Sequence, residues 1–238
     1  MATDAPVFAA APAGPWPQWL ALGAVAGPLI FTLTWLILGF VSPGYTAWGV
    51  TIAPYSPISS PVSGLGLGPT GPFMNAAFVA CGVLLLGGLV GIGAALDGLS
   101  RFARRTSLIL LGLVALGSIV DGLFTIETGG VHFLGSLVGL AAPVPAFLVT
   151  GLMLRRLPGW RQLGGLLIVA SVVTLVLVIV FFATFTPTVD GARTGVAGLT
   201  ERILIVEILA WYVALGRHAR RAMRSGPTPT ASRTTSRP

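Results

Sequence analysis

Four residues of the sequence could carry out acid–base chemistry, and they fall in or beside long apolar stretches. Asp121, Glu127 and His132 stand close together along the chain, and Glu207 stands within the last apolar stretch. Carboxyl and imidazole groups donate and accept protons near neutral pH when their surroundings adjust them to it. We therefore take these four residues as the candidate catalytic residues, for proton transfer on a lipophilic substrate.

A second set of polar residues is placed to hold a ligand. Helical spacing puts Ser118, Asp121 and Thr125 on one face of a helix, and His132 and Ser136 on one face of the next. This convergence predicts a polar pocket at the outer end of the molecule. The candidate ligand-binding residues at this level are Ser59, Ser63, Asn75, Glu201 and Arg202.

Each buried ionisable residue also has a structural explanation. Charged side chains are costly within a membrane, so each one has either a function or a partner that fixes two helices. Asp121 could lock two helices through an ion pair or a hydrogen bond, with Arg202 as one candidate partner, or it could transfer protons or bind a ligand. Glu207 could be a carboxyl hydrogen-bonded between helices, or part of a proton relay. Both explanations stay open for each residue.

Residue types that the chain lacks exclude several functions. Without lysine, the chain forms no Schiff base and has no P-loop lysine. The single cysteine, Cys81, excludes an intrachain disulfide, and the separate positions of His132 and His218 disfavour paired haem ligation. A metal site would need Asp121, Glu127 and His132 to converge through a folded-back turn. We expect no metal and no cofactor. We also expect no nucleic acid, because the basic residues behind the net charge of +7 form no stripe interleaved with aromatic residues.

The elements that must position these residues are long apolar helices. With 54% hydrophobic and 9% charged residues, the chain has too little polar surface for a soluble globule. Stretches of about twenty apolar residues predict membrane-spanning helices. We predict an all-α polytopic membrane protein, a six-helix transmembrane bundle over residues 19–217, with helices at about 19–40, 73–96, 106–126, 132–154, 163–185 and 199–217. The apolar stretch of the sixth helix is short, so this helix could instead enter the membrane only halfway.

The arginines give this bundle an orientation. Twelve of the 14 basic residues lie in two short gaps between helices and in the C-terminal segment, and only Arg193 and Arg202 lie elsewhere. Because basic residues concentrate on the cytoplasmic side, both termini are predicted to be cytoplasmic. We expect a disordered tail over 1–18, a long extracytoplasmic loop over 41–72 and a basic disordered tail over 218–238.

The segment YSPISSPVSGLGLGPTGPFMNAAF, residues 55–78, resembles the signature of an uncharacterised family of bacterial and archaeal six-helix membrane proteins, domain of unknown function 998. The resemblance implies the architecture and no activity. It extends over most of the chain. The matching residues are Pro61, Val62, Ser63, Leu65, Gly66, Asn75, Gly122, Phe124, Glu127, His132, Gly198, Leu199, Glu201 and Arg202.

The chain departs from the family pattern at three places. Gly64 stands where the family has a glutamate, and Thr125 and Glu127 replace a Pro and an Asp in the turn. Ser136 stands in the position of a second histidine. If the family site is catalytic or metal-bound, the resemblance implies that this member has lost several of its ligands.

These observations leave three functions open for a multi-pass protein of the bacterial cytoplasmic (inner) membrane. The first is binding of a lipid or isoprenoid-like molecule, or of a partner protein, in the outer polar pocket. The second is a membrane-embedded non-redox enzyme, a cyclase, isomerase or hydrolase that uses the buried acids. The third is a proton-coupled transporter with Asp121 and Glu207 as a relay, which the absence of an internal repeat disfavours.

Overall fold

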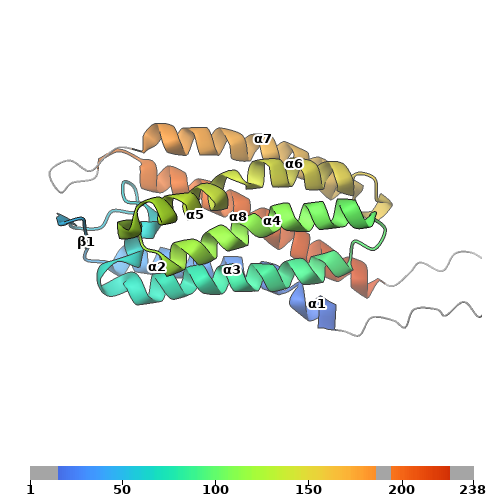
Figure 1. Cartoon of the computed structure of the whole chain (residues 1–238), viewed down its shortest axis with the longest axis horizontal. Helices are drawn as coiled ribbons and strands as arrows, with labels where there is room; N and C mark the ends of the chain where they lie inside the picture. Colours follow the sequence, from blue (N-terminus) through green and yellow to red (C-terminus); the bar gives the residue numbers. More distant parts are fainter. Residues whose placement is uncertain (1–15, 186–193, 226–238) are drawn as a thin grey trace, which may run out of the picture.

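The computed structural model describes residues 16–185 and 194–225, and within them most of the chain is helical (Figure 1). The all-α prediction is confirmed. Two short strands and four 3₁₀ turns complete the fold. The helices are α1 Trp16–Leu20, α2 Gly23–Val41, α3 Gly71–Ala94, α4 Arg101–Leu123, α5 Gly130–Ala141, α6 Pro143–Leu154, α7 Arg161–Thr184 and α8 Ala197–Arg224.

Five helical stretches of the described chain are long and apolar enough to cross a membrane. They are 16–41, 68–94, 101–123, 130–154 and 158–184. Large aliphatic side chains point outward from them, such as Leu33 and Ile37 on α2 and Val172, Val176 and Ile179 on α7. A water-soluble protein rarely exposes so continuous an apolar surface. The chain is therefore a helical protein of the multi-pass membrane type.

The last helix, α8, is long but is not one of these five apolar stretches. It packs against α2, α3 and α7, and Leu204, Ile208, Tyr212 and Leu215 are buried on it. The Tyr212 hydroxyl donates to the Leu111 carbonyl at 2.6 Å. Because protein rather than lipid covers much of α8, its sequence carries more polar residues than the other helices. It also continues to Arg224, beyond the predicted end at residue 217.

Several predicted boundaries were wrong. The first helix is divided into α1 and α2, and α1 begins inside the segment predicted as a tail. The fourth divides into α5 and α6 at Ala142, because Pro143 and Pro145 lack the N–H groups that would continue the helix. The remainder of the two predicted tails, and the residues Asp190 and Arg193, lie outside the described residues.

The long loop after α2 contains ordered structure. Strand β1 (Tyr45–Ala47) pairs antiparallel with β2 (Val50–Ile52), and the 3₁₀ turns η1 (Val62–Gly66) and η2 (Gly68–Thr70) lead into α3. The two turn residues of the hairpin, Trp48 and Gly49, both have positive φ, which a two-residue hairpin of this twist requires.

The bundle has two unlike ends (Figure 1). The hairpin and the turn between α4 and α5 lie at one end, with the 3₁₀ turn η3 (Ile126–Thr128) in that turn. The arginine-bearing turns after α3 and α6, with the 3₁₀ turn η4 (Pro158–Trp160), lie at the other end together with α1 and the end of α8. The arginine-bearing turns therefore lie at the opposite end of the molecule from the hairpin and the turn between α4 and α5.

Glycines allow the helices to pack closely. At the crossing of α4 and α5, a Cβ on Gly117 would lie 2.6 Å from the Gly135 carbonyl oxygen. At the crossing of α2 and α3, a Cβ on Gly88 would overlap the Ala24 backbone. Small residues at such crossings are typical of membrane helix pairs. Gly88, Gly91 and Gly117 each approach a neighbouring backbone too closely to carry a side chain without a shift.

Candidate functional site

The close crossing of α4 and α5 brings three polar side chains together at the hairpin end of the bundle. The Ser136 hydroxyl donates to Asp121 Oδ2 at 3.0 Å and lies 3.4 Å from His132 Nε2. The other carboxyl oxygen, Asp121 Oδ1, lies 3.5 Å from His132 Nδ1. Asp121 and His132 are only 8% and 7% exposed. A buried cluster of carboxyl, hydroxyl and imidazole groups therefore exists where the sequence predicted a polar pocket.

The protonation of the His132 ring follows from its neighbours. Nδ1 lies 2.8 Å from the Phe124 carbonyl oxygen, which can only accept a hydrogen bond. Nδ1 therefore carries the proton, and in the neutral ring Nε2 presents a lone pair. In that tautomer Nε2 is a hydrogen-bond acceptor, and the Ser136 hydroxyl lies within reach of both Nε2 and Asp121.

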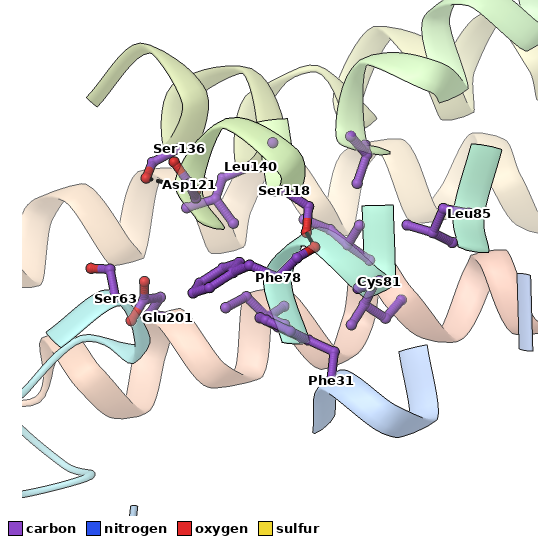
Figure 2. A pocket seen from close by; sticks show the side chains of 15 residues that line it. Phe31, Ser63, Phe78, Cys81, Leu85, Ser118, Asp121, Ser136, Leu140 and Glu201 are labelled. Carbon is purple, nitrogen blue, oxygen red and sulfur yellow. Dashed lines mark hydrogen bonds between the residues drawn. The ribbon is translucent and has the colours of Figure 1, made fainter. Parts of the chain in front are cut away.

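Two cavities meet at this cluster. The smaller, of about 60 Å³, lies among α2, α3, α4, α5 and α8. Asp121 and Ser136 border it on one side, and Ser63 of η1 and Glu201 of α8 lie across from them (Figure 2). The larger, of about 370 Å³, is mostly apolar and extends between α5 and α7. Ser63, Ser136, Leu140 and Glu201 line both cavities.

The apolar wall of the larger cavity comes from aromatic and aliphatic side chains. Phe181, Phe182 and Phe185 line it from α7 and the residue after it, and Phe133 and Leu137 line it from α5. Apolar pockets of 300–1,000 Å³ with a few polar groups are the usual form of small-molecule sites. These phenylalanines were not predicted as site residues, although three of them cluster at the end of one predicted helix.

Arg202 does not pair with Asp121, so the suggested partner was wrong, and Asp121 on α4 is instead hydrogen-bonded to Ser136 on α5. The Arg202 guanidinium donates to the carbonyl oxygens of Pro57, Ser60 and Gly198 at 2.8–3.0 Å and to the Tyr55 hydroxyl. The Trp35 ring lies 5.3 Å from its Cζ atom, within the range of a cation–π contact. Arg202 therefore fixes the loop before η1 to α8. No pattern in the sequence indicated Tyr55 as its partner.

Glu201 and Asn75 also hold the loop in place. Glu201 Oε2 accepts a hydrogen bond from the Val62 N–H at 2.6 Å. The Asn75 side chain donates to the Gly66 carbonyl oxygen at 3.0 Å. Of the five predicted ligand-binding residues, Ser63 and Glu201 line the cavities, whereas Ser59, Asn75 and Arg202 do not line either of them.

The remaining two candidate catalytic residues lie apart from the cluster. Glu127 Oε1 accepts from the Trp48 N–H at 3.3 Å and so joins η3 to the hairpin. Glu207 accepts from the Thr174 hydroxyl at 2.8 Å and from the Trp211 indole N–H at 2.7 Å. Both contacts fit the explanation that Glu207 is a carboxyl group hydrogen-bonded between helices. Neither Glu127 nor Glu207 lines the two cavities.

Comparison with known proteins agrees with this architecture. The model of a family described as proteins of unknown function, DUF998, matches residues 25–218. The chain belongs to the DUF998 family. The matched region spans α2 to most of α8 and contains every residue of the cluster. No curated protein and no solved structure matches the chain.

At Gly64, where the resemblance implied a glutamate, a Cβ would lie 2.7 Å from Cε1 of the Tyr45 ring, so a larger residue there requires that ring to shift. Ser136, where the resemblance implied a second histidine, contacts both Asp121 and His132. The DUF998 comparison itself assigns no activity to these residues.

Proposed function

We propose that the protein crosses the bacterial cytoplasmic membrane six times, with α8 as the sixth crossing and both termini in the cytoplasm. The grouping of the arginine-bearing turns with both ends of the described chain supports this orientation (Figure 1). The cavities then open toward the extracytoplasmic side, because they lie at the hairpin end.

Cysteine labelling of intact cells tests this topology. In a Cys81→Ala background, Val50→Cys places a thiol on the exposed hairpin, and Gly159→Cys places one between α6 and α7, where a Cβ meets nothing within 4 Å. A membrane-impermeant maleimide should label residue 50 in intact cells and residue 159 only after permeabilisation. Labelling of residue 159 in intact cells contradicts the orientation.

The function that the geometry supports best is binding of a lipid or isoprenoid-like molecule in the larger cavity. The observation that carries this proposal is a mostly apolar space of about 370 Å³ with polar groups at one end. Burial of an alkyl chain there removes apolar surface from water or from a mobile bilayer, and the phenylalanines hold it by dispersion contacts. Binding requires no cofactor and no further residue.

A photoactivatable alkane that carries a diazirine tests this function. Light should cross-link it to the α5 and α7 residues that line the cavity, as mapped by mass spectrometry of purified protein in nanodiscs. Leu140→Trp should fill the space and abolish those cross-links. Leu134→Trp is the matched control, because Leu134 is on the same helix and 60% exposed on the outer surface. Cross-links confined to outward-facing residues contradict the proposal.

One observation favours an enzyme as the second candidate. The Ser136 hydroxyl contacts both a carboxyl group and an imidazole nitrogen, which is how a hydroxyl is activated for acid–base or nucleophilic chemistry. A hydrolase, cyclase or isomerase acting on a lipophilic substrate would use this cluster. Incubation with a lipid extract should then give a new mass that persists in Glu207→Gln and disappears in Asp121→Asn. An unchanged lipid profile contradicts the enzyme and leaves binding as the function.

A further inference from the structure

Three segments that carry arginines meet at one end of the bundle. The His218 ring, near the end of α8, donates to the Gly159 carbonyl oxygen in the turn between α6 and α7 at 2.9 Å. A Cβ on Gly98, in the turn between α3 and α4, would lie 2.8 Å from Leu157 Cδ2 of that same turn. The arginines within residues 101–105, 155–161 and 217–224 therefore form one basic surface, here called the arginine face, at the end of the bundle that carries α1 (Figure 1).

Carboxylate groups of the chain balance little of the charge on the arginine face. Asp97 is the one acidic residue at this end among the described residues, and it pairs with Arg104 at 3.3 Å. No other carboxylate of the described residues lies within ion-pair distance of these arginines. The sequence before α1 contains one acidic residue, Asp4, and the sequence after α8 contains Arg233 and Arg237 and no acidic residue. The excess positive charge of the face is therefore left for anions outside the chain to neutralise.

The exposed arginines of α8 lie on one side of the helix. Arg217, Arg221 and Arg224 are spaced i, i+4 and i+7, and all three are exposed. A guanidinium group stays charged at physiological pH and binds phosphate oxygens through paired hydrogen bonds. The end of α8 thus presents a row of groups that suit phosphate.

Apolar side chains continue from the arginine face along the outside of the bundle. Phe102 is 76% exposed at the start of α4, and Ile109 and Leu116 follow it on the outer surface at intervals of seven residues. Trp19 of α1 is 64% exposed, and its ring lies 6.0 Å from Arg220 Cζ. Tryptophan and arginine next to an apolar helix surface are typical of the level where lipid head groups meet the acyl chains. The face therefore fits a lipid surface better than a nucleic acid, which has no apolar layer.

Charge and apolar surface together specify the partner. We propose that the arginine face binds phospholipids that carry a net negative charge. Their phosphates lie between the guanidinium groups, and their acyl chains lie along the outer surface below Phe102 and Trp19. Zwitterionic phospholipids also have a phosphate, but their ammonium group is repelled by the arginines, so charge separates the two classes. The arginine face lies at the opposite end of the bundle from the two cavities, and the proposal does not depend on lipid binding in them.

Lipid retention tests the proposal. The full-length protein is placed in nanodiscs of equal parts phosphatidylglycerol and phosphatidylcholine with the same acyl chains and is extracted with mild detergent. Native mass spectrometry then counts the retained lipids. Phosphatidylglycerol should exceed phosphatidylcholine at least about fivefold at about 0.1 M salt, and the ratio should fall toward one at about 1 M salt, because salt screens exposed charges. Equal retention of the two lipids at low salt overturns the proposal.

Two triple variants test whether charge on α8 causes the preference. Arg217→Gln, Arg221→Gln and Arg224→Gln together should lower the ratio at least about threefold. Arg217→Lys, Arg221→Lys and Arg224→Lys together keep the charge and should keep most of the preference, because an ammonium group also attracts phosphate. An unchanged ratio in the glutamine variant, or an equal loss in both variants, overturns the proposal.

Two controls separate the arginine face from other sites and other polyanions. Leu140→Trp fills the larger cavity and should leave the ratio unchanged, and loss of the preference in this variant places the anionic lipid in the cavity and overturns the proposal. A fluorescent RNA oligonucleotide should not bind the protein in phosphatidylglycerol nanodiscs at about 0.15 M salt. RNA that binds these nanodiscs but not empty ones shows that lipid does not occupy the arginines, and also overturns it.

Discussion

Gly135 on α5 lies directly against Asp121 on α4: a Cβ on Gly135 would stand 2.6 Å from Asp121 Oδ1. The absence of a side chain at this one position lets the carboxyl group turn between the helices and reach Ser136. The geometry of the site therefore depends on a residue that performs no chemistry.

Gly135→Ala should consequently displace the Asp121 carboxyl or separate α4 from α5. Overpacking of this kind costs about 1–3 kcal/mol, so the Tm measured by thermal denaturation in detergent should fall. Gly139→Ala is the control, because its Cβ would lie 3.8 Å from Gly117 Cα, an ordinary contact. That variant should keep the wild-type Tm or raise it slightly. An equal fall in both variants contradicts a specific role for Gly135.

Tyr55 should make the stability of the loop sensitive to alkaline pH. Burial is the main cause that raises the pKa of its hydroxyl above the ordinary value, although the neighbouring Arg202 lowers it. In the unfolded chain the hydroxyl ionises near pH 10. Its contribution is therefore fully present below about pH 10 and is lost as the pH rises further, toward the pKa of the folded state.

Tyr55→Phe removes this titration, together with the hydrogen bonds to Pro61 and Arg202. The variant should have a lower Tm at neutral pH, and its Tm should fall less steeply than that of the wild type above about pH 10. Other tyrosines are present in both proteins, so the difference between the two curves isolates Tyr55. If the Tm of the two proteins falls in parallel above about pH 10, the titration of Tyr55 does not cause the loss of stability.

The long apolar stretches were sufficient to predict that the chain is a bundle of helices, although not where each helix begins and ends. Twenty-residue apolar stretches have few alternatives to a helix in a membrane, because each backbone group must be hydrogen-bonded within its own segment. The interruptions at Ala142 and between α1 and α2 were missed because membrane helices tolerate proline and glycine, so that neither residue marks a boundary by itself.

The candidate site could be predicted in part. The spacing of His132 and Ser136, and of Ser118 and Asp121, gave the faces on which the polar groups lie. Which faces meet depends on the crossing of α4 and α5, and therefore on Gly117 and Gly135 packing against each other. The Arg202 contacts join residues far apart in the chain, and no periodicity encodes them. Pairing with Asp121 was the natural expectation from charge alone, and it was wrong.

Arg202→Lys should destabilise the protein although it conserves the charge. The planar guanidinium donates to three carbonyl oxygens and stacks beside Trp35, and a lysine ammonium cannot reproduce that geometry. We expect a loss of at least about 2 kcal/mol, because hydrogen bonds to charged groups are strong and the buried carbonyls lose their partners.

Thermal denaturation and limited proteolysis of the loop over residues 42–70 measure this effect. Cleavage in the loop should become faster in Arg202→Lys. Arg221→Lys is the control, because Arg221 is exposed in the last turn of α8. If both variants resist proteolysis as the wild type does, Arg202 does not hold the loop.

The Trp48 side chain should control entry into the larger cavity. Trp48 lines that cavity, yet 64% of the residue is exposed, so it stands where the cavity meets the surface rather than in the core. Its φ of 49° lies in the left-handed region, which costs a non-glycine residue about 1–2 kcal/mol. The Trp48 N–H bond to Glu127 helps to hold the hairpin in this position.

Trp48→Gly should relieve the backbone strain and open the entrance to the larger cavity. Val50→Ala is the control, because Val50 is an exposed hairpin residue that does not line the cavity. After mixing with the alkyl diazirine, cavity cross-links should accumulate several-fold faster in Trp48→Gly than in Val50→Ala or the wild type, with the same final yield. An unchanged rate in Trp48→Gly means that the probe enters from the lipid side between α5 and α7, and the hairpin does not limit access.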